Sequence, residues 1–258
     1  MLKVHHIILG NRITPLVREC LQSWTTATNC GFEFHQWTDA SIAEFMKNEP
    51  VEFQNLLKRA RNYGEAGDIL RCMILGRLGG LYVDWDVLLL DPQRLLKVLG
   101  DLKEEKCLFL EDRKTQAVGY TSVFANSFFY MQKGNPLARD LLLQMDRDYM
   151  NSPEMPTVEL TGPMSLTRFL ETRPHYLREA KVLDLTDVYS FDYAEVRKFY
   201  SRESLAKHRN YSRAPAVHFW SHEWIPQKRL TLAVTAATAC LGSLVGEVKI
   251  RATSWLSR

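Results

Sequence analysis

The fold is decided by residues 79–87, which read GGLYVDWDV. The apolar run predicts a buried strand, and Asp84 and Asp86 interrupt it. Because side chains alternate along an extended chain, we expect these carboxylates to point the same way and Trp85 the opposite way. Adjacent carboxylates repel each other unless a cation lies close to both. Oxygen ligands suit Mg²⁺ or Mn²⁺, so the stretch predicts a metal site; the alternative is a turn with two solvated aspartates.

A helix is predicted just before this strand, over residues 65–78. Apolar residues recur there at helical spacing, and two glycines end the segment. Asp68 and Arg71 are three residues apart and therefore share one face of the helix. They form either an ordinary ion pair or a polar pair that grips a sugar, the carboxylate binding hydroxyls and the guanidinium binding hydroxyls or phosphate.

Outward from this centre, apolar runs and turn residues divide the chain into alternating strands and helices. This alternation predicts an α/β fold whose central sheet is largely parallel and is flanked by helices. Strands are expected at residues 4–9, 32–37, 81–90, 107–110, 122–132, 182–185 and 216–220. Helices are expected from residue 15 to beyond 24 and at residues 41–47, 51–61, 65–78, 136–150 and 164–171.

Composition excludes several classes of protein. The chain has 258 residues, of which 46% are hydrophobic and 24% charged, so neither disorder nor a collagen or coiled-coil architecture is expected. A net charge of +3 is too small to predict nucleic-acid binding. The five cysteines are widely spaced and contain no C-x-x-C, which favours a reducing cytosol over a disulfide framework or zinc site. The N-terminal apolar run is too short for a signal peptide.

Two segments together resemble a known family. Residues 66–71, AGDILR, and residues 79–86, GGLYVDWD, resemble the signature A-x-x-D-x-x-R … G-G-x-Y-x-D-x-D of the DXD-containing sugar transferases of glycosyltransferase family 32. That family includes capsular polysaccharide enzymes and mannosyltransferases. Weaker resemblances cover the first strand at residues 4–10, the loop at residues 161–163 and a C-terminal motif at residues 218–224.

The resemblance implies a GT-A fold with a mixed, mainly parallel central sheet. It also implies a nucleotide-sugar donor, Mn²⁺ or Mg²⁺, and transfer with retention of configuration. It assigns Asp86 as the direct metal ligand. Asp84 would contact the donor and the metal. His218 is the expected C-terminal metal ligand, with His222 as the alternative.

The resemblance also implies a set of residues that contact the donor. Asp68 and Arg71 would hold the sugar, and Asn126 would lie near it. The remaining implied contacts are to the base (Ile8, Leu9, Gly10) and to the diphosphate (Ser221, Trp224). Several relatives have Trp where this chain has Ile8, so the choice between UDP and GDP stays open.

The implied function is transfer of a hexose to a glycan, lipid-linked or glycolipid acceptor, in polysaccharide or glycolipid biosynthesis. The alternative of a host-protein acceptor, as for toxins, stays open. No general base is assigned. One alternative is a haloacid-dehalogenase-like phosphatase that uses Asp84 as nucleophile together with Asp86. Another is a sugar-nucleotide-binding module without catalysis.

The chain divides into a catalytic domain at residues 1–225 and a tail at residues 226–258. The tail contains five basic residues and one acidic residue, and its apolar stretch at residues 230–245 is too short to span a bilayer. It is expected either to lie on an anionic membrane surface as an interfacial helix or to pack against the core. The predicted location is therefore the cytoplasm, with the inner face of a membrane as a site of peripheral contact.

Overall fold

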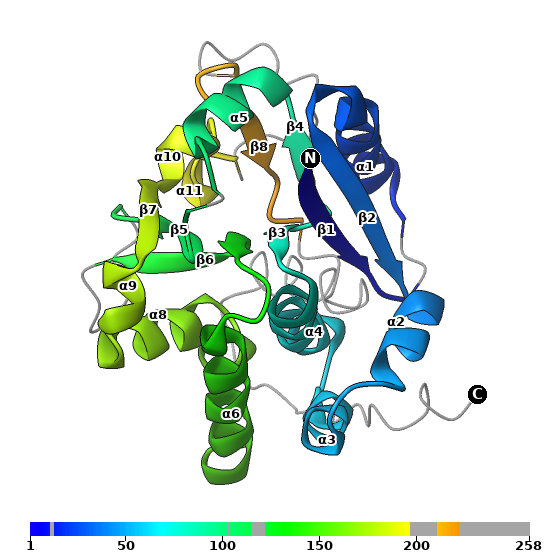
Figure 1. Cartoon of the computed structure of the whole chain (residues 1–258), viewed down its shortest axis with the longest axis vertical. Helices are drawn as coiled ribbons and strands as arrows, with labels where there is room; N and C mark the ends of the chain where they lie inside the picture. The colour runs from blue at the N-terminus through cyan, green and yellow to red at the C-terminus, as the bar shows by residue number, and fades with distance from the viewer. Residues whose placement is uncertain (11–12, 103, 115–121, 197–210, 222–258) are drawn as a thin grey trace, which may run out of the picture.

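The computed structural model describes residues 1–10, 13–102, 104–114, 122–196 and 211–221. Within these residues, six strands form one sheet in the order β2-β1-β3-β6-β5-β7, and β4 pairs with β8 in a second, two-stranded sheet (Figure 1). The strands are β1 (Leu2–Ile8), β2 (Phe32–Thr38), β3 (Gly80–Val83), β4 (Val87–Leu89), β5 (Cys107–Asp112), β6 (Val123–Met131), β7 (Ala180–Asp184) and β8 (Ala216–His218).

Helices connect most of these strands and cover the central sheet. The longer helices are α1 (Pro15–Thr26), α2 (Asp39–Met46), α3 (Val51–Arg59), α4 (Tyr63–Leu78), α5 (Pro92–Leu99), α6 (Pro136–Asn151) and α8 (Pro163–Thr172). The short ones are η1 (Ala27–Cys30), α7 (Thr157–Leu160), α9 (His175–Arg178), α10 (Leu185–Val188) and α11 (Tyr193–Val196).

The central sheet is mixed. β1 pairs in parallel with β2 and β3, and β5 pairs in parallel with β7. β6 is antiparallel to both of its neighbours, β3 and β5. This confirms the predicted α/β fold with a mixed, mainly parallel sheet between helices.

Alternation of side chains along the strands builds a core on each face of the sheet. In β3, Tyr82 packs on one face, and Leu81 and Val83 pack on the other. In β6, Phe129 packs on the same face as Tyr82, and Phe128 packs on the opposite face. The first face is covered by α4, α6 and α8, and the second by α1, α5, α10 and the β4–β8 pair.

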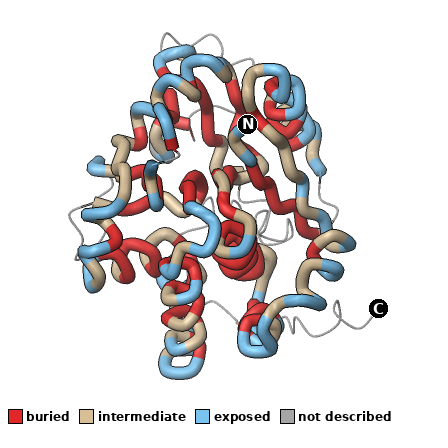
Figure 2. The backbone as a smooth tube through the Cα atoms, in the orientation of Figure 1, coloured by how far each residue is buried: buried red, intermediate tan, exposed pale blue. Residues whose placement is uncertain are grey.

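Helix α4 is buried over most of its length. Its residues 65–75 are all buried, including three charged ones, and Figure 2 shows this segment as a continuous buried stretch below the sheet. Asn62 caps the helix by accepting a hydrogen bond from the Glu65 amide, and Gly79 ends it at φ +68°. These three buried charged residues therefore face neighbouring protein elements or a cleft.

The prediction of one continuous strand over residues 81–90 was wrong. β3 ends at Val83, the chain turns at residues 84–86, and β4 begins at Val87 in the other sheet. The Val87 amide donates to the Asp84 carbonyl at 3.2 Å, which closes the turn. Asp84 and Asp86 therefore lie in a turn and do not alternate along an extended strand.

Helix α5 was also not predicted, although its beginning has a recognisable signal. Asp91 precedes Pro92, and the Asp91 side chain accepts a hydrogen bond from the Arg94 amide. The short helices α7, α9, α10 and α11 also went unpredicted, because four residues are too few for a helical period to show.

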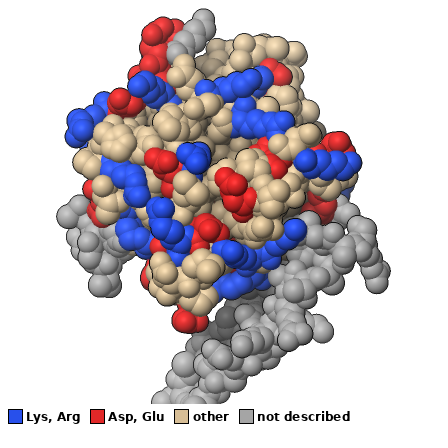
Figure 3. Space-filling model, turned by 60° about the horizontal axis from the view of Figure 1, so that its bottom comes forward, with Lys and Arg blue, Asp and Glu red and all other residues tan. Residues whose placement is uncertain are grey.

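Charged residues on the surface are mixed in sign. Exposed ion pairs such as Lys47–Glu44 and Arg59–Asp146 bring opposite charges together, and the face drawn in Figure 3 carries both signs side by side. No helix among the described residues is long and apolar enough to cross a membrane. The predicted tail at residues 226–258 lies outside the described residues.

Two adjacent histidines in β1 are buried on opposite faces of the sheet. His5 bonds the Gly79 carbonyl through Nε2 at 2.9 Å and accepts from Trp37 Nε1 at 3.1 Å. His6 packs against Trp24 on the other face. Burial lowers the pKa of His5 to about 4 and that of His6 to about 3. Both imidazoles are therefore neutral in the folded protein at neutral pH.

These two histidines should make the protein less stable in mild acid. The unfolded chain takes up protons near pH 6.5, whereas the folded chain does so only near pH 4 or below, so stability is complete above pH 6.5 and falls as the pH falls. Each histidine should contribute about 2 kcal/mol of destabilisation between pH 7.5 and 5.0. Urea unfolding at the two pH values measures this loss. His6→Leu should show about 2 kcal/mol less of it, and an unchanged loss in that variant would contradict the assignment.

Candidate functional site

The turn at residues 84–86 is held in place from three sides. The Asp84 amide donates to the Ser127 carbonyl of β6 at 2.8 Å. Trp24 Nε1 of α1 donates to the Val87 carbonyl at 2.8 Å. β4 pairs with β8 in a register that places Val87 opposite His218. The two-stranded sheet thus brings His218 next to Asp86, more than 130 residues earlier in the chain.

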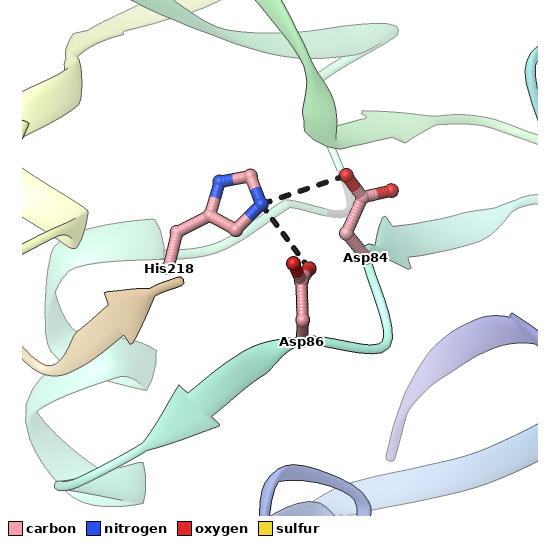
Figure 4. Close-up of side chains that lie close together, drawn as sticks. All are labelled: Asp84, Asp86 and His218. Atoms are coloured by element: carbon pink, nitrogen blue, oxygen red, sulfur yellow. Dashed lines mark ion pairs between the residues drawn. The ribbon is translucent and has the colours of Figure 1, made fainter. Parts of the chain in front are cut away.

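Asp84, Asp86 and His218 form a compact cluster. His218 Nε2 lies 3.2 Å from Asp86 Oδ1 and 3.7 Å from Asp84 Oδ2, and Figure 4 shows the three side chains converging on one point. One potential ligand atom from each residue lies within 4.8 Å of the others. Two carboxylates and an imidazole form a ligand set that suits Mn²⁺, and the carboxylates suit Mg²⁺.

Asp86 is ionised although it is almost completely buried. Its side chain is only 4% exposed, and its Oδ2 accepts hydrogen bonds from the Ser221 amide at 2.7 Å and the Ser221 hydroxyl at 2.9 Å. Burial opposes ionisation, but His218 and Ser221 outweigh it and lower the pKa of Asp86 below its usual value. Ser221 binds Oδ2, so Oδ1 remains directed toward His218 and the cluster.

His218 is held by aromatic neighbours. Its ring stacks on Trp220 with centroids 4.1 Å apart and an interplanar angle of 28°, and Tyr189 lies on it at 5.3 Å. Trp220 has φ +46°, an uncommon backbone conformation for a large residue. This strained turn brings the indole under the imidazole and Ser221 onto Asp86.

Asp68 and Arg71 of α4 lie beside this cluster and are also buried. Asp68 accepts hydrogen bonds from Asn126 Nδ2 and Thr161 Oγ1, both at 2.8 Å, and its Oδ1 lies 2.9 Å from Arg71 Nη2. Burial raises the pKa of Asp68 to about 6, against the opposing effects of Arg71 and Thr161. The pair is therefore not the solvated surface ion pair that was the alternative prediction.

Arg71 links the two groups of carboxylates. Its Nη1 lies 3.4 Å from Asp84 Oδ1 and also donates to the Asn126 carbonyl, while its guanidinium lies over the Tyr82 ring at 4.3 Å. Tyr82 in turn donates its hydroxyl to Asp84 Oδ1 at 2.7 Å. Arg71 therefore orients Asp68 and Asp84 together.

These residues line one cleft of about 650 Å³. Among the described lining residues, five are acidic and one is basic (Asp68, Asp84, Asp86, Asp112, Glu159; Arg71). Such a cleft repels an anionic ligand unless a cation is bound in it. The ends of β1 and β6 and the α7–α8 segment complete its walls.

The structure brings most of the predicted site residues together. Eight of them line the cleft: Leu9, Asp68, Arg71, Asp84, Asp86, Asn126, His218 and Ser221. Ile8 does not line it, because it faces the opposite side of β1 and packs against Val17 and Leu21. Gly10 lies at the end of β1, where its amide donates to Asp39 Oδ2 at 3.0 Å. His222 and Trp224 lie outside the described residues.

Three side chains at the site have no role predicted from the sequence. Tyr82 and Trp220 line the cleft beside predicted residues, and Thr161 donates to Asp68. Tyr82 stands two residues before Asp84, so alternation along β3 could have placed it on the α4 side. No local pattern indicates the contact between Thr161 and Asp68, which are 93 residues apart.

Comparison with known proteins indicates the class of enzyme. Residues 14–104, which contain the Asp68–Arg71 pair and both aspartates of the turn, match the family model described as "Glycosyltransferase sugar-binding region containing DXD motif". No curated protein matches the sequence significantly. The chain is a glycosyltransferase, as its sequence predicts, and the match favours this interpretation over the phosphatase.

Solved structures of glycosyltransferases are similar to this chain. A glycosyltransferase involved in the glycosylation of the major capsid of PBCV-1 is 10% identical, with 86% of this chain and 94% of that chain covered and a TM-score of 0.50. The PaToxG glycosyltransferase is 19% identical, with 68% of this chain and 72% of that chain covered and a TM-score of 0.49. The glycosyltransferase GlyE of Streptococcus pneumoniae TIGR4 is 11% identical, with 92% of this chain and 64% of that chain covered and a TM-score of 0.48. The expected GT-A type fold is confirmed.

The cluster should bind Mn²⁺ in the absence of any other ligand. Asp86→Asn keeps the shape of the side chain but removes a charge, so we expect Mn²⁺ affinity to fall at least about tenfold. The free Mn²⁺ signal in electron paramagnetic resonance measures this affinity. Asp146→Asn, on the exposed side of α6, is the matched control and should bind as the wild type does. Equal affinity in the wild type and Asp86→Asn would rule out the cluster as the metal site.

Proposed function

We propose that this glycosyltransferase moves a hexosyl group from a UDP- or GDP-sugar to an acceptor hydroxyl, with retention of configuration and with dependence on Mn²⁺ or Mg²⁺. The observation that carries the proposal is the position of the Asp84–Asp86–His218 cluster beside the buried Asp68–Arg71 pair in one cleft. The cluster would suit a cation bound to a diphosphate, and the Asp68–Arg71 pair would suit the hydroxyls of a sugar.

The charge of the cleft supports dependence on a metal. A nucleotide diphosphate is anionic, and the described lining offers five carboxylates against one guanidinium. Asp84, Asp86 and His218 would hold the ion, which supplies the positive charge that neutralises the departing diphosphate. Ser221 keeps Asp86 ionised and oriented for this role.

The donor sugar would lie against Asp68, Arg71 and Asn126. Asp68 already satisfies three donors in the protein, which fixes its position, and its carboxylate can also accept from sugar hydroxyls. Arg71 holds the pair close to Asp84 and therefore close to the sugar–phosphate bond. Preorganised groups of this kind stabilise a transition state without having to reorganise.

The base would lie at the end of β1. Leu9 and its neighbours Ile7 and Tyr63 give this end of the cleft an apolar wall. A Cβ at Gly10 would lie 2.7 Å from Tyr63 Cζ, so only glycine lets Tyr63 approach the strand this closely. Trp224 remains a proposed contact to the diphosphate, and His222 the alternative metal ligand.

A nucleotide-sugar panel tests this proposal. The wild type should release nucleotide from at least one of UDP-glucose, UDP-galactose, UDP-N-acetylglucosamine and GDP-mannose in MnCl₂ and not in EDTA. Asp68→Asn should lower kcat/KM for that donor about a hundredfold or more while Mn²⁺ affinity stays at the wild-type value, because Asp68 is not in the metal cluster.

The control is Asp140→Asn, which alters a carboxylate that accepts from Tyr176 outside the cleft. Full activity of Asp68→Asn would reduce the Asp68–Arg71 pair to a structural role. Absence of release from every donor would favour a sugar-nucleotide-binding module.

We also propose that the acceptor is a glycan, a lipid-linked glycan or a glycolipid, and that the enzyme acts in polysaccharide or glycolipid biosynthesis. In addition, we propose that residues 226–258 contact an anionic membrane peripherally. The basic and apolar composition of that segment supports the contact. The full chain should co-sediment with phosphatidylserine-containing vesicles, and the variant Lys228→Glu/Arg229→Glu should do so at least about tenfold more weakly. Equal sedimentation of the two proteins would exclude the contact.

A further inference from the structure

Glu65 is a completely buried carboxylate to which the proposed function gives no role. It is 0% exposed, lies on α4 one turn before Asp68, and does not line the cleft. A buried charge of this kind is strongly destabilising unless it is well paired, so its contacts show what it organises.

Six hydrogen bonds saturate the Glu65 carboxylate. Arg61 donates three of them, from Nε at 2.8 Å, Nη2 at 2.6 Å and its own amide at 2.7 Å. Tyr149 of α6 donates its hydroxyl at 2.8 Å, and Asn62 donates from Nδ2 at 3.3 Å. The sixth donor is the Thr157 hydroxyl at 2.8 Å, at the beginning of α7.

The same group of residues also holds the segment that leads into α7. Arg61 donates from Nη1 to the Pro153 carbonyl at 2.7 Å and from Nη2 to the Met155 carbonyl at 2.8 Å. Asn62 Nδ2 donates to Thr157 Oγ1 at 3.0 Å. The beginning of α4 therefore fixes the chain between α6 and α7 at several successive points.

Helix α7 needs this support. It has only four residues, and Pro156 at its N-terminus provides no side-chain cap. A helix this short is not stable without tertiary contacts. We name residues 157–164 the α7 wall, because Thr157, Val158, Glu159, Gly162, Pro163 and Met164 all line the cleft.

The α7 wall contacts the Asp68–Arg71 pair directly. Thr161 Oγ1 donates to Asp68 Oδ2 at 2.8 Å. Gly162 packs so closely that a Cβ there would lie 2.8 Å from Val158 Cα, so the wall is a compact unit. A shift at Thr157 would therefore move Thr161 relative to Asp68.

We propose that Glu65 is a positioning residue of the donor-sugar site, which holds the α7 wall through Thr157 and so keeps Thr161 in place on Asp68. Glu65 does not touch the substrate; it acts through the wall. This inference rests on the proposed function, since it assigns Asp68 to the donor sugar.

Thr157→Val tests the link without leaving a bare charge, because it removes one of six donors and keeps the shape of the side chain. With MnCl₂ and the donor sugar nucleotide that gives the fastest release, kcat/KM should fall about tenfold, as expected for loss of one hydrogen bond to a charged group. Mn²⁺ affinity should stay at the wild-type value. Thr157→Ser restores the hydroxyl and should recover most of the loss.

Thr172→Val is the matched control, because that hydroxyl bonds the Arg168 and Phe169 carbonyls at the end of α8, away from the cleft. Its kinetics should equal those of the wild type. If Thr157→Val also has wild-type kcat/KM while Asp68→Asn is impaired, the positioning role of Glu65 is wrong.

Amide hydrogen exchange separates this proposal from the proposed function, since it needs no activity. In Thr157→Val, the amides of residues 159–162, which donate to the Pro156 and Thr157 carbonyls, should exchange about tenfold faster than in the wild type, and in Thr172→Val they should not. Unchanged exchange over the α7 wall would overturn the proposal even for an active enzyme. If no donor is turned over by the wild type, the proposed function fails, and faster exchange would still support Glu65 as the anchor of the wall.

Discussion

Arg71 is a buried cation on which the arrangement of the site depends. It contacts Asp68 on its own helix, Asp84 at the end of β3 and the Asn126 carbonyl on β6, and it lies on the Tyr82 ring. Removing the guanidinium would leave the buried Asp68 carboxylate without its cationic partner, which is strongly destabilising. The guanidinium thus links α4 to two strands of the sheet and sets the distance between Asp68 and the Asp84–Asp86–His218 cluster.

The described residues that line the cleft nevertheless carry an excess of negative charge, and the proposed function depends on this excess. Asp86 is held ionised by Ser221 and His218, and Arg71 neutralises only part of the charge of Asp68 and Asp84. A site of this kind favours a divalent cation and, through it, an anionic diphosphate. In the proposed function, the carboxylates would lie where a cation is needed, and the guanidinium would lie where sugar and phosphate meet.

The sequence predicted the parts of the site that are local in the chain. Asp68 and Arg71 share one face of a helix at a spacing of three residues, and Asp84 and Asp86 stand out as two carboxylates two residues apart, although they lie in a turn. His218 was assigned by resemblance alone, because its approach to Asp86 depends on the pairing of β4 with β8. The extended conformation assumed for residues 81–90 was wrong, since periodicity cannot show that one apolar run serves two sheets. The contacts of Thr161 and Glu65 with residues about 90 positions away follow from packing and have no local signal.

The central claim is that one cation is held where β3, β4 and β8 meet. Anomalous X-ray diffraction from crystals soaked in MnCl₂, measured at the manganese absorption edge, tests it most directly. We predict a peak within bonding distance of carboxylate oxygens of Asp84 and Asp86 and of His218 Nε2. A peak elsewhere in the cleft, with none at this cluster, would contradict the account.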